Sequence, residues 1–208
     1  MSDADEITVY SDYVCPFCYL GRQSLAEYQA TRDDELAIDW RPFDLRAGKR
    51  NPDGSIDHDV DDGKDDDYFE EVRENVERLK DEYGAEEMTI DVSRDVDSLN
   101  AQVASLYVRE THPEDWLAFD EAVFEALWED GRDIGDVDVL AELAADAGLD
   151  PGEVRDAVAS DEWRDRLEDA FREAREAGVS GVPTFAYDGY GARGAVPPAQ
   201  LERLVEGT

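Results

Sequence analysis

The chain has 208 residues, enough for one domain with an insertion or for two small domains, and 41% of them are hydrophobic, so it can bury a sizeable core. Its 55 Asp and Glu residues outnumber 20 Lys and Arg residues, and the net charge of −35 argues against nucleic acid or anionic membranes as partners. The acidic residues are spread over the whole chain instead of forming a tail. This pattern is typical of proteins that work in concentrated salt, and we therefore expect a halophilic protein.

Residues 1–10, MSDADEITVY, contain neither the basic segment nor the apolar segment of a secretory signal. No run in the sequence is long and apolar enough for a transmembrane helix. We therefore expect a cytoplasmic protein without a membrane partner. Disulfides in that compartment are usually transient and catalytic. Within these residues, Ile7–Tyr10 is a short apolar strand candidate.

Residues 11–21, SDYVCPFCYLG, follow this strand and contain the two cysteines of the chain, Cys15 and Cys18. Two thiols at this spacing cannot complete a structural zinc site or a disulfide scaffold by themselves, but they can open and close one disulfide. Pro16 is suited to the first position of a helix, so Cys15 is expected at the helix N-cap, where the helix dipole favours a thiolate.

Cys18 lies one turn further into this helix and is expected to be less exposed than Cys15. We predict that Cys15 is the nucleophile and that Cys18 resolves the mixed disulfide formed at Cys15. The alternative is a reduced, buried pair of cysteines that serves only in packing.

The next strand is predicted at Leu36–Trp40, where apolar and polar residues alternate. It follows the motif helix, which we expect from about Cys15 to Arg32, and would therefore pair in parallel with the first strand through a βαβ crossover.

An acidic stretch follows, in which Asp57, Asp59 and Asp61 alternate as they do in a calcium-binding loop. The sixth position of such a loop would be Asp62 and the twelfth Tyr68, where an EF-hand requires glycine and glutamate. We interpret the stretch as an acidic surface loop.

Residues 68–160 have apolar residues at helical spacing, which predicts a series of helices separated by capping residues, prolines and glycines. The only two histidines, His58 and His112, have no cysteine or second histidine nearby in the sequence, and we interpret both as surface residues. No metal site is predicted.

The last part of the chain returns to a mixed α/β pattern. A long amphipathic helix is predicted over 161–178, followed by a β-type stretch over 179–187. The turn Asp188-Gly189 leads to a weak strand candidate over 191–195, and a closing helix is predicted over 199–205.

Five segments of the sequence resemble one family: VCPFCYLG, WRPFDL, GRDIGDVDVLAELAADAGLD, GVSGVPTF and GARGAVPPAQL. Together they cover nearly the whole chain and resemble the DsbA-like thioredoxin-fold proteins, in particular the FrnE-like or 2-hydroxychromene-2-carboxylate-isomerase-like branch. The resemblance implies an α/β protein with a discontinuous thioredoxin-like domain at residues 1–47 and 161–208. An all-helical insertion, including the acidic loop, would occupy residues 48–160, between the βαβ and ββα halves.

The resemblance also implies a cis peptide bond between Val182 and Pro183 beside the cysteine pair. The substrate-binding positions would then be Pro16, Phe17, Val182, Pro183 and Thr184.

Two positions differ from the relatives of the family. Many DsbA-type oxidants have histidine where this chain has Phe17, which makes a very strong oxidant less expected here. In the isomerase relatives the first thiol position is typically serine and glutathione is the cofactor, whereas this chain has Cys15. Asn100 resembles an asparagine in the helical insertion of the family, and we assign no role to it.

These features favour a thiol–disulfide oxidoreductase acting on protein or small-molecule thiols, with an external electron donor or acceptor. We expect no bound cofactor besides the redox-active Cys15–Cys18 pair, with glutathione or another low-molecular-weight thiol as a co-substrate. Two alternatives stay open. One is a thiol-dependent isomerase or transferase, and the other is a non-catalytic peptide-binding or chaperone module.

Overall fold

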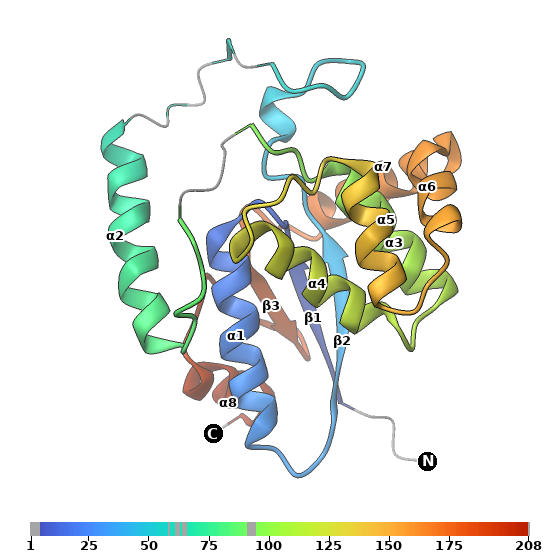
Figure 1. The fold of residues 1–208 in the computed structure, drawn as a ribbon. Helices are drawn as coiled ribbons and strands as arrows, with labels where there is room; N and C mark the ends of the chain where they lie inside the picture. The colour runs from blue at the N-terminus through green and yellow to red at the C-terminus, as the bar shows by residue number, and fades with distance from the viewer. Residues whose placement is uncertain (1–4, 58, 61–62, 64–65, 91–94, 208) are drawn as a thin grey trace.

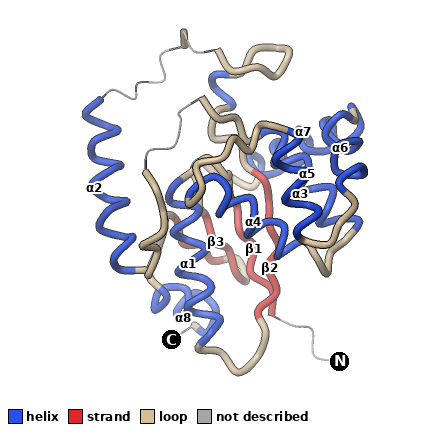
Figure 2. Tube along the Cα trace, viewed as in Figure 1, coloured by secondary structure: helices blue, strands red, loops and turns tan. Residues whose placement is uncertain are grey.

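The protein is described by a computed structural model that covers residues 5–57, 59–60, 63, 66–90 and 95–207. Four strands form one sheet in the order β2-β1-β3-β4. The strands are β1 (Asp5–Ser11), β2 (Leu36–Pro42), β3 (Thr184–Tyr187) and β4 (Tyr190–Arg193). β1 and β2 are parallel, and β3 lies antiparallel to both β1 and β4. Strands from the two ends of the chain therefore share one sheet (Figures 1 and 2).

The helices α2 to α7 lie between β2 and β3 in the sequence, while α1 and α8 belong to the two end segments. The helical elements are α1 (Pro16–Ala30), the 3-10 helix η1 (Ala47–Lys49), α2 (Asp66–Glu82), α3 (Leu99–Thr111), α4 (Trp116–Trp128), α5 (Val137–Asp146), α6 (Pro151–Ala159), α7 (Asp161–Glu176) and α8 (Pro198–Glu206). This arrangement confirms the α/β fold with an all-helical insertion between two halves.

Two clusters of buried apolar side chains form the core. The smaller cluster lies between the sheet and the helices α1 and α8, and includes Ile7, Val9, Leu25, Phe185 and Leu201. The larger cluster joins the insertion helices to the N-terminal end of α1, where it includes Cys15 and Cys18. The insertion and the cysteine motif therefore share one continuous apolar interior.

Several elements differ from their predicted bounds. The β-type stretch expected over 179–187 forms a strand only from Thr184 onward, because Pro183 has no N–H for a strand ladder and residues 179–182 form a loop. α1 ends at Ala30, slightly earlier than expected, and β2 continues to Pro42.

The acidic stretch and the histidines are described in part. Asp57 and Asp59 belong to a turn in which the Asp59 N–H donates to Asp57 Oδ1 (2.9 Å), while His58, Asp61 and Asp62 lie outside the described residues. His112 follows α3, and its Nε2 lies 3.3 Å from Glu153 Oε2.

Candidate dithiol site

The cysteine motif forms the junction between β1 and α1. Cys15 is the N-cap residue of α1, with extended backbone angles (φ −93°, ψ 114°), and Pro16 occupies the first helical position. The Cys15 carbonyl oxygen accepts from the N–H groups of Cys18 (2.9 Å) and Tyr19 (3.4 Å), which closes the first turn. This confirms the position of Cys15 that the following proline predicts.

Both cysteines are free thiols, and both are buried. The exposed fraction is 4% for Cys15 and 1% for Cys18, so Cys15 is far more enclosed than a freely accessible nucleophile would be. Burial raises the pKa of the Cys18 thiol well above its ordinary value, and the neighbouring Cys15 raises it further. The backbone N–H of Asp12 and the Ser11 hydroxyl act in the opposite direction. Cys18 therefore favours its protonated form while both thiols are reduced.

The proline loop lies against the motif. The Cys15 thiol donates to the carbonyl oxygen of Val182 (3.6 Å), and the Val182–Pro183 peptide bond is cis, as the family resemblance implied. The Pro183 carbonyl oxygen accepts from the Gly194 N–H (2.8 Å), and Thr184 Oγ1 donates to the Gly181 carbonyl oxygen (2.7 Å).

Of the five predicted substrate-binding residues, Val182 contacts Cys15 directly. Pro16 and Phe17 occupy the first turn of α1 and are half-buried, and Pro183 is buried beside that helix. Thr184 opens β3, where it pairs with Tyr10 of β1. The structure therefore brings the motif and the proline loop to the same end of the sheet.

Gly21 lets α1 approach the sheet closely. A Cβ atom at this position would lie 3.1 Å from Pro183 Cγ and 3.1 Å from Phe185 Cζ. Such contacts are tighter than ordinary van der Waals contacts, so a methyl group here would require the Pro183 or Phe185 side chain, or the helix, to shift by a few tenths of an ångström.

Asp12 is a buried residue of the site that the sequence analysis did not identify. Its carboxylate accepts from Ser98 Oγ (2.5 Å), Gln102 Nε2 (3.3 Å) and the N–H groups of Val14 (3.3 Å) and Leu45 (2.8 Å). Burial raises the pKa of Asp12 to about 6, although the hydrogen bonds from Ser98 and Leu45 oppose that shift. The carboxyl thus joins the cysteine loop to α3 and to the segment after β2.

A second, partly buried network supports the same region. The Arg50 guanidinium forms paired hydrogen bonds to Asp44 (2.6 and 3.1 Å) and to Asp97 (2.8 and 2.9 Å), and it also donates to the Gly54 carbonyl oxygen (2.9 Å). Such planar paired contacts are specific to arginine. Arg50 therefore holds the chain after β2 against the residues that precede α3.

The other side of the motif is attached to α4. The Tyr13 hydroxyl donates to Asp120 Oδ1 (2.6 Å), and the Tyr13 carbonyl oxygen accepts from Trp128 Nε1 (2.8 Å). The Tyr19 hydroxyl donates to Glu129 (2.5 Å). The cysteine loop is therefore fixed from both sides by side chains of the insertion.

Asn100 has a definite structural place. Its Nδ2 donates to the Gly135 carbonyl oxygen (2.7 Å), and its Oδ1 accepts from Arg164 (3.0 Å). Asn100 thus connects α3 with the loop before α5 and with α7.

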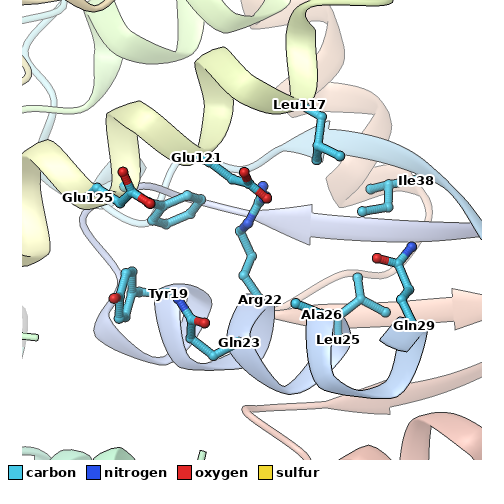
Figure 3. A pocket seen from close by; sticks show the side chains of 11 residues that line it. Tyr19, Arg22, Gln23, Leu25, Ala26, Gln29, Ile38, Leu117, Glu121 and Glu125 are labelled. Atoms are coloured by element: carbon cyan, nitrogen blue, oxygen red, sulfur yellow. The ribbon is translucent and has the colours of Figure 1, made fainter. Parts of the chain in front are cut away.

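A pocket of 230 Å³ lies between α1 and α4 (Figure 3). Phe124 and Ile38 contribute apolar surface, Glu121 and Glu125 contribute carboxylates, and Arg22 extends between the two helices. Arg22 is paired with Asp120 and Glu121. None of the predicted site residues lines this pocket, so it is separate from the dithiol.

Neither a cluster of metal-binding side chains nor a membrane-spanning helix is present among the described residues. No group of three or more His, Cys, Asp or Glu side chains is placed to hold a metal ion. No helix in the described part of the chain is both long and apolar enough to cross a membrane.

Comparison with known structures shows the same fold in several proteins. A probable DsbA oxidoreductase, SCO1869 from Streptomyces coelicolor, is 24% identical, with a TM-score of 0.77 over 97% of this chain and 88% of that one. A 2-hydroxychromene-2-carboxylate isomerase is 20% identical, with a TM-score of 0.77 over 95% and 92% of the two chains. The cytosolic disulfide reductase DsbM from Pseudomonas aeruginosa is 20% identical, with a TM-score of 0.63 over 90% and 87%. A structure of DsbM with glutathione has a TM-score of 0.58.

Sequence comparison points to the same family as the structural comparison. The uncharacterized protein YwbO from Bacillus subtilis is 29% identical over 180 residues, which are 86% of this chain and 84% of YwbO. The family model described as the DSBA-like thioredoxin domain matches residues 6–206. The chain therefore belongs to the DsbA-like thioredoxin family.

Proposed function

We propose that the protein is a thiol–disulfide oxidoreductase whose reactive group is the Cys15–Cys18 pair. The observation that carries this proposal is a pair of free thiols at the N-terminal end of α1, with the Cys15 thiol directed at the Val182 carbonyl oxygen. Cys18, whose thiol pKa is raised by burial, lies one turn further into the same helix.

The exchange proceeds in two steps that conserve electrons and protons. The Cys15 thiolate attacks one sulfur of a substrate disulfide, forms a Cys15–substrate disulfide and expels the other half as a thiolate. Cys18 then transfers its proton to the expelled thiolate, attacks Cys15 Sγ and expels the second half as a thiolate, which takes up the proton that Cys15 gave to solvent before its attack. Two electrons pass from the dithiol to the substrate, which leaves as two thiols. The reverse sequence oxidises a substrate dithiol.

The surrounding residues have assigned roles in this proposal. Val182 presents its backbone carbonyl oxygen to the Cys15 sulfur, and Pro183 and Thr184 hold that loop in place. Pro16 and Phe17 form the half-buried surface next to the nucleophile. Because the chain has no cysteine besides this pair, the electron partner is an external thiol or disulfide. We also propose a cytoplasmic location, since a reducing compartment keeps such a pair available for exchange.

Single-cysteine variants test the dithiol mechanism. Cys15→Ser should abolish exchange with bis(2-hydroxyethyl) disulfide, because serine cannot form the mixed disulfide. Cys18→Ser should react once and accumulate a covalent adduct at Cys15, since the resolving thiol is missing. Mass spectrometry under non-reducing conditions detects the adduct, and dithiothreitol should release it. Undiminished turnover by Cys18→Ser would refute the dithiol mechanism.

Undiminished turnover by Cys18→Ser would instead favour a thiol-dependent isomerase, which needs only Cys15. The fold shared with 2-hydroxychromene-2-carboxylate isomerase is the observation that keeps this candidate. Activity that survives the loss of both thiols would instead indicate the peptide-binding or chaperone module.

A further inference from the structure

A short segment after α2 passes beside the dithiol end of α1. We call residues 83–90 the strap. The Tyr83 hydroxyl donates to the Ala195 carbonyl oxygen (2.8 Å), and the Thr89 N–H donates to the Trp128 carbonyl oxygen (2.5 Å). In Figure 1 the strap runs alongside the N-terminal half of α1, between that helix and α2.

The two anchors lie on opposite sides of the cysteine motif. Ala195 directly follows Gly194, whose N–H donates to the Pro183 carbonyl oxygen (2.8 Å). Trp128, at the other anchor, donates its Nε1–H to the carbonyl oxygen of Tyr13 (2.8 Å). One end of the strap is thus attached next to the proline loop, and the other next to the cysteine loop.

The strap is packed into the same interior as the thiols. Ala85 (3% exposed) and Met88 (2% exposed) belong to the continuous apolar cluster that also contains Cys15 and Cys18. Cys15 itself is 4% exposed. A disulfide in a folded protein brings bulky flanking backbone with its sulfurs, and this backbone needs open space around the nucleophile that the structure does not offer.

We propose that the substrates of the dithiol are low-molecular-weight disulfides and thiols, and that the strap excludes the disulfides of folded proteins. This inference rests on the proposed oxidoreductase function. The exchange is the one described above, in which a small molecule R–S–S–R is reduced to two R–SH while Cys15 and Cys18 are oxidised to a disulfide. A small sulfur compound can reach a nearly closed site that a protein chain cannot enter.

The test compares two disulfides of different size. The reduced protein is mixed with bis(2-hydroxyethyl) disulfide or with insulin, and thiol consumption is followed over time. Each rate is divided by the rate of dithiothreitol with the same disulfide, which corrects for intrinsic reactivity. The corrected rate with insulin should be at least about tenfold lower, because exchange depends on access to the attacked sulfur.

Two strap variants identify the barrier. Tyr83→Phe removes the hydrogen bond to Ala195 and should raise the corrected insulin rate about fivefold, the change in opening equilibrium expected for one lost hydrogen bond. Its rate with bis(2-hydroxyethyl) disulfide should not change. Met88→Ala should act in the same direction by removing buried apolar contacts. Tyr107→Phe is the matched control, because Tyr107 donates to Glu153, far from the strap in the fold.

The outcomes separate the two proposals. Equal corrected rates for both disulfides in the wild-type protein would overturn the size restriction and leave the oxidoreductase function intact. A wild-type restriction that neither strap variant relaxes would show that the strap is not the barrier. Absence of exchange with both disulfides would refute the oxidoreductase function itself.

Discussion

Asp12 is a carboxyl group surrounded by hydrogen-bond donors, and it lies three residues before the proposed nucleophile. Its donors come from the adjacent loop (Val14), from the chain after β2 (Leu45) and from the start of α3 (Ser98 and Gln102). Because burial raises the pKa of Asp12 to about 6, the carboxyl changes its charge in the mildly acidic range. The connection between the cysteine loop and the insertion should therefore depend on pH.

We predict a specific pH dependence for Asp12→Asn. The folded protein binds the Asp12 proton more tightly than the unfolded chain does, so this proton stabilises the fold fully below about pH 4, and the contribution is lost as the pH rises through about 6. Raising a carboxyl pKa from 3.8 to about 6 corresponds to about 3 kcal/mol. The free energy of unfolding of the wild type minus that of Asp12→Asn should fall by about 2–3 kcal/mol between pH 4 and pH 7.

Urea unfolding at constant, high salt measures this difference at each pH. Asp156→Asn, at an exposed position of α6, is the control and should show a much smaller pH dependence. A difference that stays constant between pH 4 and pH 7 would contradict the assignment.

For single residues, the sequence predicts a role correctly where that role depends on residues nearby in the chain. Pro16 directly after Cys15 identifies the helix N-cap, since both residues act within one turn. The partners of Asp12 and Arg50 lie up to 90 and 47 positions away in the sequence, so no local pattern distinguishes these two residues from the other charged residues of an acidic chain.

The distance between α1 and β3 is set by a residue without a side chain. Gly21 is in the middle of α1, where glycine costs about 1 kcal/mol of helix stability relative to alanine. The close approach of Pro183 and Phe185 explains why glycine is nevertheless suited to this position. The packing of the helix against the sheet therefore outweighs its local propensity.

Gly21→Ala should impair exchange more than it impairs folding. The added methyl group gains about 1 kcal/mol in helix propensity and loses about 1–3 kcal/mol through overpacking against Pro183 and Phe185, so the net change in stability is small. We expect α1 to relieve the contact by moving away from the proline loop, which would separate Cys15 from Val182. We expect a several-fold lower rate with bis(2-hydroxyethyl) disulfide.

Gly152→Ala is a suitable control, because a Cβ there would also meet a neighbour at 3.0 Å, the Asp150 side chain at the start of α6. Its exchange rate should stay near that of the wild-type protein. If Gly21→Ala reacts at the wild-type rate, the separation of α1 from the proline loop does not limit the exchange.

The helices and strands that the sequence predicts correctly are those with a regular apolar spacing or with a clear boundary residue. The parallel pair β1 and β2 and the long helix α7 are examples. The residues before Pro183 were not, because a β-type composition over 179–187 does not show that the chain first forms a loop against Cys15. The path of the strap was also unpredictable, since its contacts with Ala195 and Trp128 are determined by the tertiary fold.

Over the whole molecule, 20 basic residues balance only part of 55 acidic ones. Helix α2, with the sequence DDYFEEVRENVERLKDE, has eight Asp and Glu residues and three Arg and Lys residues, so like charges recur one turn apart, as at Glu70 and Glu74. Each such pair opposes helix formation by a few tenths of a kcal/mol in dilute buffer. The larger of the two apolar clusters, in contrast, is continuous from the insertion to the dithiol, so surface repulsion in the insertion acts on the same packed interior as the thiols.

This charge distribution predicts that the protein is stabilised by salt. A net charge of −35 in a compact body produces self-repulsion that weakens when the chain unfolds and the charges separate. Salt shortens the Debye length from about 30 Å at 0.01 M to about 3 Å at 1 M, which screens that repulsion. We expect the melting temperature to rise steeply with NaCl up to about 1 M, where screening between neighbouring surface charges is nearly complete. Exchange activity should recover in parallel if low salt had reduced it.

Sucrose is the control, because it stabilises compact states without screening charge. A melting temperature that is the same at 0.01 M and 1 M NaCl would contradict the halophilic interpretation, whatever the activity of the dithiol.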